Sequence, residues 1–174
     1  MHKYIFVDFD GVLVSERYHA AVLSAGKVPS DLYGPLFDPE AVENLRMIID
    51  ATGAGVIISS TWKFEGETRM KGLWDKRKMP GTLLGSTPDT ALDIDILSMD
   101  LDDPNTFANL AGKGSEVKAW LKQNAPKDPS KYRYVILDDM TDFLPEQKDN
   151  FIQVSPRVGI TMEDAVKAIE ILSR

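Results

Sequence analysis

Two aspartates near the start of the chain have a spacing that suggests chemistry. Asp8 and Asp10 follow the β-forming apolar run Tyr4–Val7, and Gly11 comes directly after them. The run predicts a buried strand over residues 3–8, and a strand that continued to Asp10 would point both carboxylates to one face. Two such carboxylates repel one another unless a cation lies between them. The stretch is therefore either half of a cation site or an ordinary polar turn.

Polar residues also follow two other predicted strands, namely Ser59 and Ser60 after residues 56–58, and Asp138 and Asp139 after residues 134–137. Lys113 stands at the predicted start of a helix. The carboxyl ends of parallel strands meet at one edge of a sheet, where ligands bind. Two of the predicted strands end in carboxylates, another ends in serine hydroxyls, and a lysine is added by the helix start. These are the groups that phosphoryl transfer needs.

Some of these assignments have alternatives in the sequence itself. Ser59 could simply cap a strand end, and Ser60 could replace it as the functional hydroxyl. Lys118 lies about one helical turn after Lys113 and competes with it, but we prefer Lys113 because it stands at the helix start. Asp142 is either a further carboxylate near the metal or a helix cap.

The composition limits the other possible site chemistries. The 174 residues include no cysteine and only two histidines, which excludes disulfides and thiolate sites and disfavours a multi-histidine metal centre. The many aspartates favour a hard cation such as Mg²⁺. A net charge of −7 argues against broad nucleic-acid binding. We find no membrane-spanning run and no signal-peptide pattern, so we expect a cytoplasmic protein without a membrane partner.

Strands and helices alternate along the chain. Further strands are expected at 82–85 and 151–154, and helices within 18–25, 38–52, 63–78, 113–124 and 161–172. Residues 12–37 otherwise resemble a loop, and the acidic stretch 89–103 is expected to be a solvated loop. This pattern predicts an α/β protein with a central, mainly parallel sheet in a single domain over residues 1–174.

The stretch 63–78 carries six basic and three acidic residues. Its simplest interpretation is the solvated face of a helix, and the alternative is a basic groove that attracts phosphate. The aromatic residues Trp62 and Trp74 are interpreted in the same way, as core residues or as platforms for stacked bases. The sequence leaves the oligomeric state open.

The motifs together resemble the haloacid dehalogenase (HAD) superfamily of phosphohydrolases over nearly the whole chain. The four motifs appear in order as Val7–Gly11, Ile57–Ser59, Lys113 and Ile136–Asp139. The chain is more closely similar to the HAD domains of Swiss Army knife RNA repair proteins. The residues that carry this closer resemblance are Ile58–Trp62, Lys113–Val117 with Trp120 and Leu121, Tyr134–Asp139 and Thr161–Leu172. The chain departs from that pattern at Lys63, where the family usually has arginine, and at Ser115, where it usually has glutamate.

The resemblance implies a role for each candidate residue. Asp8 is the expected nucleophile and Asp10 the general acid and base. Ser59 is expected to bind a phosphoryl oxygen, and Lys113 to neutralise the phosphate and orient Asp8. The expected Mg²⁺ ligands are Asp8, the backbone carbonyl of Asp10, and Asp138 or Asp139. Ser60 and Lys63 are expected to contact the substrate.

The resemblance also implies a Rossmann-like, three-layer HAD fold with at most a small cap, and a Mg²⁺-dependent phosphomonoester hydrolase that forms an aspartyl-phosphate. An open site would admit a phosphorylated nucleic-acid end. The alternative substrates are small phosphorylated metabolites or nucleotides, whose enzymes usually need a lid. A further alternative is a non-catalytic phosphate-binding or partner-binding domain.

Overall fold

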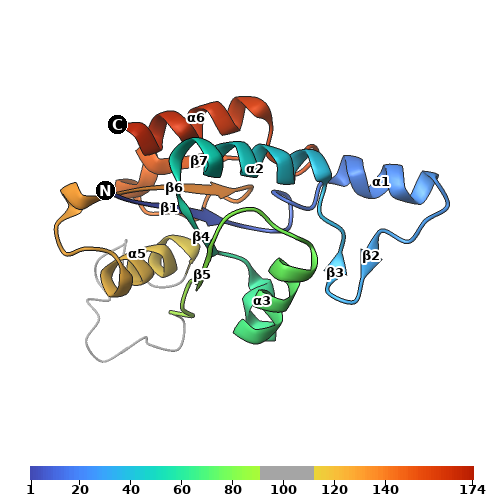
Figure 1. The fold of residues 1–174 in the computed structure, drawn as a ribbon, viewed down its shortest axis with the longest axis horizontal. Coiled ribbons are helices and arrows are strands. Elements are labelled where there is room, and N and C mark those ends of the chain that lie inside the picture. Colours follow the sequence, from blue (N-terminus) through green and yellow to red (C-terminus); the bar gives the residue numbers. More distant parts are fainter. Residues whose placement is uncertain (91–111) are drawn as a thin grey trace, which may run out of the picture.

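The centre of the computed structural model, which describes residues 1–90 and 112–174, is a sheet of five parallel strands in the order β5-β4-β1-β6-β7 (Figure 1). The strands are β1 (His2–Val7), β4 (Gly55–Ile58), β5 (Leu83–Ser86), β6 (Tyr132–Asp138) and β7 (Phe151–Gln153). Each contains or overlaps an apolar run from which a strand was predicted. The solvated loop expected over 89–103 lies, from residue 91 onward, outside the described residues.

Helices cover both faces of this sheet. The helices are α1 (Glu16–Ser24), α2 (Pro39–Thr52), α3 (Glu67–Lys76), α5 (Lys113–Asn124) and α6 (Met162–Ser173), and the 3-10 turns are η1 (Thr61–Glu65), η4 (Pro129–Lys131) and η5 (Pro145–Asn150). Helices α2 and α6 lie over one face, α5 lies under the other, and α3 packs beside β5 (Figure 1). This confirms the three-layer α/β architecture. None of the described helices is long and apolar enough to cross a bilayer.

The helix ends follow from local sequence. The carboxylate of Asp38 accepts a hydrogen bond from the Glu40 N–H, Pro39 occupies the first turn of α2, and Gly53 ends the helix with φ = 68°. At the start of α6, Thr161 and Asp164 form a reciprocal capping box. Both helices therefore begin where their caps predict.

The central strand β1 is buried on both sides, as a strand in the middle of a parallel sheet must be. Ile5 and Val7 point into the larger core cluster, which includes residues of α2 and α6. Tyr4 and Phe6 point into the second cluster with residues of α5. Because successive side chains alternate, the apolar run supplies both cores at once and fixes the direction in which its carboxyl end projects.

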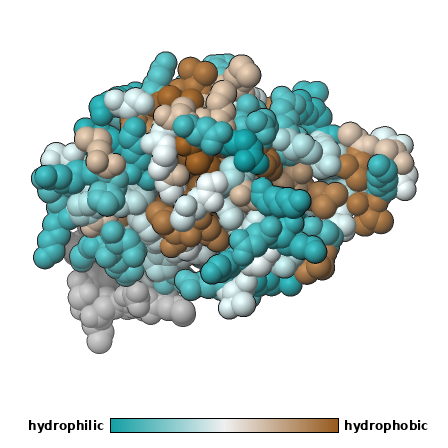
Figure 2. Space-filling view, in the orientation of Figure 1, coloured by the Kyte–Doolittle hydropathy of each residue, from teal (hydrophilic) through white to brown (hydrophobic). Residues whose placement is uncertain are grey.

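The chain between β1 and α2 forms a small insert that consists of α1 and a hairpin, β2 (Ser30–Asp31) and β3 (Gly34–Pro35). The sequence prediction missed this hairpin because two-residue strands leave no periodic pattern. Two arginines of the basic stretch hold it in place: Arg77 pairs with Asp31 at 2.7 Å and donates to the Gly34 carbonyl, and Arg69 donates to the Leu32 carbonyl. Exposed apolar residues of the insert include Leu23, Val28 and Leu32. Figure 2 shows apolar surface at the right of the view, where Figure 1 places α1 and the hairpin.

Lys63 joins η1 to α5 through a largely buried ion pair. Its Nζ atom lies 2.5 Å from the Glu116 carboxylate, 3.0 Å from the Thr87 hydroxyl and 3.4 Å from the Pro88 carbonyl. The side chains of Lys63 and Glu116 are only 7% and 15% exposed. The three partners use all three N–H groups of the ammonium ion. Lys63 therefore fixes the segment after β4 relative to the helix that begins at Lys113.

This pair predicts a stability difference between two lysine variants. Lys63→Ala leaves the Glu116 carboxylate buried without its cation and should lower the free energy of unfolding by about 3–5 kcal/mol. Lys118→Ala is the matched control, because Lys118 and Glu146 form an exposed, solvent-screened pair whose loss should change the free energy of unfolding little. Urea denaturation measures both values. Equal losses in the two variants would contradict a structural role for Lys63.

Candidate active site

The register of two neighbouring strands brings Asp8 and Asp138 side by side. Val7 of β1 pairs with Leu137 of β6, so the next residue of each strand stands at the same edge of the sheet. The Asp8 N–H donates to the Leu137 carbonyl at 3.1 Å, which continues the pairing by one residue. Asp8 and Asp138 are 5% and 0% exposed. Two carboxylates are thus buried next to one another, which costs free energy unless positive charge is present.

Lys113 supplies part of this positive charge. Its Nζ atom contacts the Asp8 carboxylate and lies 2.7 Å from Asp138 Oδ2. Lys118 points elsewhere, since its side chain is 66% exposed and pairs with Glu146. Asp142 accepts a hydrogen bond from the Lys113 N–H at 3.3 Å, so its carboxylate contacts the first turn of α5, whose N-cap residue is Gly112. Of the two candidate lysines, only Lys113 therefore reaches the carboxylates.

Close backbone packing fixes the start of α5, and with it Lys113. A Cβ atom on Gly114 would lie 2.7 Å from the Leu144 nitrogen, so only glycine fits here without a shift. The buried Gln147 side chain donates to the Gly114 carbonyl at 2.8 Å and accepts from the Leu144 N–H at 2.9 Å. No local sequence pattern identifies Gly114 or Gln147 as supports of the site, because their partner segments are remote in the sequence.

Burial raises the pKa of Asp138 to about 7; the neighbouring Asp8 also raises it, and Lys113 acts in the opposite direction. Burial raises the pKa of Asp8 as well, against the effect of Lys113. Burial lowers the pKa of Lys113, but the attraction of Asp8 and Asp138 outweighs it, so the pKa of this lysine is raised and the ammonium form is retained. The site is therefore short of positive charge.

A third carboxylate completes an oxygen-rich cluster. Asp8, Asp138 and Asp139 each offer an oxygen, and these three atoms lie within 4.8 Å of one another. Asp139 rests against Gly11, where an added Cβ would lie 2.6 Å from the Asp139 carboxylate carbon. Three carboxylates face the single ammonium of Lys113, which leaves two negative charges unbalanced when all are ionised. The donor set and the charge both fit a divalent, oxygen-loving cation such as Mg²⁺.

Two hydroxyl groups follow β4 next to this cluster. The Ser59 N–H donates to the Val7 carbonyl, which places Ser59 beside the end of β1. Its side-chain oxygen is buried and has no hydrogen-bond partner among the described residues. The Ser60 side-chain oxygen instead accepts a hydrogen bond from the Trp62 N–H at 3.5 Å, and its hydroxyl group acts to lower the pKa of the nearby Asp8. An unpaired buried hydroxyl is unusual, and here it can serve a bound oxyanion.

Asp10 lies outside the carboxylate cluster. Its side chain is exposed, and its Oδ2 atom accepts a hydrogen bond from the indole Nε1–H of Trp62 at 2.9 Å. The expected Mg²⁺ contact of Asp10 through its backbone carbonyl stays a prediction. The sequence predicts either a core residue or a stacking platform at Trp62. No local pattern predicts this third role, because Trp62 and Asp10 are 52 positions apart.

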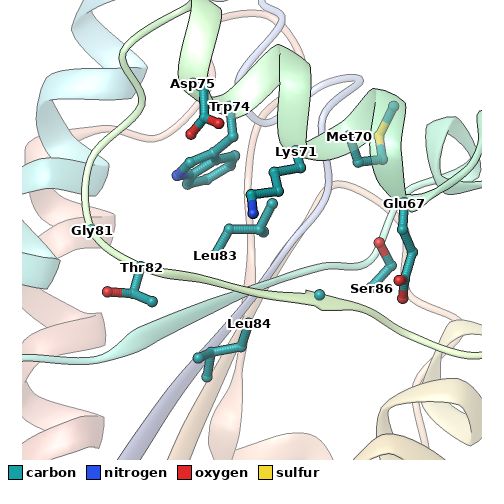
Figure 3. A pocket seen from close by; sticks show the side chains of 11 residues that line it. Glu67, Met70, Lys71, Trp74, Asp75, Gly81, Thr82, Leu83, Leu84 and Ser86 are labelled. Atoms are coloured by element: carbon teal, nitrogen blue, oxygen red, sulfur yellow. The ribbon is translucent and has the colours of Figure 1, made fainter.

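A cavity of about 510 Å³ lies away from these groups, between α3 and β5 (Figure 3). It is lined by residues such as Lys71, Trp74 and Leu83, and by none of the predicted site residues. The predicted site residues Asp8, Ser59 and Asp138 instead lie at the carboxyl edge of the sheet, as expected for a parallel α/β protein. We therefore assign no catalytic role to the cavity.

Comparison with known protein families matches residues 4–165 to the HAD domain in Swiss Army Knife RNA repair proteins. No curated protein and no solved structure matches the chain. The matched range contains all four motifs, from Asp8 to Asp139, and most of the chain, which confirms the resemblance inferred from them. The chain therefore belongs to the family of HAD domains found in Swiss Army Knife RNA repair proteins.

Proposed function

We propose that this protein is a Mg²⁺-dependent phosphomonoester hydrolase that works through an aspartyl-phosphate on Asp8. Membership of the HAD family implies a hydrolase. The observation that carries the finer proposal is the contact of Lys113 with both Asp8 and Asp138, in a cluster that Asp139 extends. The single-domain organisation and the cytoplasmic location stay parts of this proposal.

Asp8 is held in the manner that a nucleophile requires. The Phe9 N–H donates to Oδ1 at 2.7 Å, and Lys113 contacts Oδ2. A carboxylate is a weak nucleophile and repels an anionic phosphate, so its fixed orientation and the adjacent ammonium group lower the barrier to attack. The free hydroxyl of Ser59 supports this role, since it can donate to a phosphoryl oxygen.

The predicted cation completes the charge balance. Asp8, Asp138 and Asp139 would hold Mg²⁺. When bound, the ion neutralises charge on the carboxylates and on the phosphoryl oxygens. Lys113 remains to orient Asp8 and to contact the phosphate.

Asp10 is the proposed proton carrier. As a bond forms between Asp8 and phosphorus, the bond from phosphorus to the leaving oxygen breaks, and Asp10 gives that oxygen a proton. A water molecule then attacks phosphorus and returns a proton to Asp10, while the bond from phosphorus to Asp8 breaks and inorganic phosphate leaves. Such acid–base help typically contributes about 10²–10⁴-fold to the rate.

The proposed substrate is a phosphorylated nucleic-acid end. The family supports phosphorylated nucleic-acid ends, and small metabolites or nucleotides are the alternative. The basic stretch gives little support for a broad nucleic-acid groove, because Lys63, Arg69 and Arg77 pair with acidic residues of the protein itself. A non-catalytic binding domain would be expected to lack one of the reacting groups, yet Asp8, Asp10 and a lysine are all present.

The proposed nucleophile predicts a loss of turnover in Asp8→Asn. With Mg²⁺ and 4-nitrophenyl phosphate, kcat should fall by roughly a thousandfold or more, because the amide cannot form the phosphorylated intermediate. Asp75→Asn is the control, since Asp75 is an exposed carboxylate on α3. An Asp8→Asn variant as active as the parent would overturn the mechanism.

The proposed substrate class predicts a preference for oligonucleotides. For a 3′- or 5′-phosphorylated oligonucleotide, kcat/KM should exceed that for the matching mononucleotide by about tenfold or more, because remote contacts contribute binding energy in the transition state. A sugar phosphate is compared in the same way. Repeating the measurements at raised salt shows how much of the preference for the oligonucleotide is electrostatic. Equal kcat/KM values for all substrates would exclude nucleic-acid ends as the preferred class.

The raised pKa values of Asp8 and Asp138 predict how stability changes with pH in EDTA. The two carboxyl groups of the folded protein keep protons that the unfolded chain has already lost. The free energy of unfolding should therefore decrease as the pH rises from about 4 to about 7, by up to about 1.4 kcal/mol per pH unit for each proton. Mg²⁺ competes with these protons, so it should raise Tm more at about pH 8 than at about pH 5.

Thermal unfolding with and without Mg²⁺ at the two pH values tests this prediction. Asp138→Asn removes one of the titrating carboxylates and should weaken both the pH dependence and the Mg²⁺ effect. The same Mg²⁺ effect in this variant as in the parent would contradict the assignment of Asp138 to the metal site.

A further inference from the structure

The exposed carboxylate of Asp10 has one hydrogen bond among the described residues, and its donor comes from the segment after β4. The indole Nε1–H of Trp62 lies 2.9 Å from Asp10 Oδ2. Asp10 belongs neither to the cluster of Asp8, Asp138 and Asp139 nor to the ion pairs of Lys113. Without this bond the side chain could rotate in solvent, which would be poorly suited to proton transfer.

The indole ring itself is held firmly. It packs edge-to-face on Phe9 with the ring centroids 5.3 Å apart, and its centroid lies 6.0 Å from that of Phe37. The hairpin covers its far edge, since a Cβ on Gly34 would lie 3.2 Å from the Trp62 ring. The direction of the N–H group is therefore set before any substrate binds.

Arg77 contacts both the Phe37 ring next to Trp62 and the hairpin that covers the indole. Its guanidinium lies 4.3 Å from the Phe37 ring centroid and 5.9 Å from that of Trp62. The same group pairs with Asp31 and donates to the Gly34 carbonyl, which fastens the hairpin against the indole. Part of the basic stretch thus supports the aromatic residue that holds Asp10.

The chemistry of indole defines what this contact can do. The Nε1–H group is a donor only, so the oxygen that it meets must act as an acceptor. Oδ2 of Asp10 can accept this bond whether or not the carboxyl group is protonated, provided that any proton sits on Oδ1. Trp62 therefore leaves Oδ1 as the oxygen that carries the proton.

We propose that Trp62 is a positioning residue that fixes the Asp10 carboxyl group and assigns proton transfer to Oδ1. This inference rests on the proposed phosphatase function, in which Asp10 protonates the leaving oxygen and then accepts a proton from water. Trp62 contacts neither reacting atom and exchanges no proton itself. Its effect reaches the reaction only through Asp10.

Trp62→Phe tests the proposal, because it keeps an aromatic ring and deletes the N–H group. The measured quantity is kcat/KM for an alkyl phosphate and for 4-nitrophenyl phosphate, which reports the steps up to release of the leaving group. Nitrophenolate leaves without a proton, whereas an alkoxide requires one. We expect the alkyl-to-nitrophenyl ratio to fall by about tenfold or more, since general acid help is typically about 10²–10⁴-fold.

Trp74→Phe is the matched control. Trp74 is 4% exposed, and its indole nitrogen has no hydrogen-bond partner among the described residues (Figure 3). The same chemical change there should leave the ratio unaltered. Asp10→Asn should lower the ratio as well, and adding Trp62→Phe to it should produce no further fall, because both changes act on one interaction.

The outcomes separate this inference from the proposed function. A parent protein without turnover, or an active Asp8→Asn variant, would refute the proposed function and the inference that rests on it. An inactive Asp8→Asn variant, together with an unchanged ratio in Trp62→Phe, would overturn only the role of Trp62. An equal fall for both esters would also overturn it, since that is the result of general structural damage.

A second measurement covers the case in which Trp62→Phe does not fold. The indole N–H of Trp62 should exchange slowly with solvent in the parent and faster in Asp10→Ala, as followed by ¹⁵N NMR. Signals of Trp62, Trp74 and Trp120 are distinguished by their separate phenylalanine variants or, for Trp62, by elimination. An exchange rate that does not respond to Asp10→Ala would refute the proposed hydrogen bond.

Discussion

The contact of one ammonium group with two buried carboxylates is the interaction on which this site depends. Asp8 and Asp138 must stand together because β1 and β6 pair in register, and neither can be solvated freely once it is buried. Lys113 offsets part of their repulsion and keeps its proton. Asp139 adds a third carboxylate to the cluster. The single ammonium group of Lys113 does not balance the negative charge of the three when all are ionised, so the site favours a bound cation.

The scaffold around this cluster is built to hold α5 and η1 in fixed positions. Gly114 permits close approach of the helix start to the segment before η5, and Gln147 joins the two by hydrogen bonds. On the other side, Lys63 and Glu116 connect η1 to the same helix. The residues proposed for catalysis therefore project from segments whose positions are determined mutually, which is the preorganisation that electrostatic catalysis needs.

Three of the six basic residues in the stretch 63–78 make contacts within the protein, while Lys71, Lys76 and Lys78 are exposed. Lys63 is buried against Glu116, whereas Arg69 and Arg77 fasten the hairpin that follows α1. These contacts use the positive charge within the protein. A count of basic residues is consequently a poor guide to the charge that this stretch leaves free.

The amino-acid sequence was enough to predict the strand–helix order, the caps of α2 and α6, and the resemblance to HAD domains, because these depend on short apolar runs and local side-chain contacts. The sequence also favoured Lys113 over Lys118 from its place at the helix start, and the tertiary structure shows its contact with the carboxylates. The hydrogen bond from Trp62 to Asp10 could be found only in the tertiary structure. The partners in these contacts are 105 and 52 positions apart. Such pairings depend on sheet register and helix placement, which no local pattern of residues encodes.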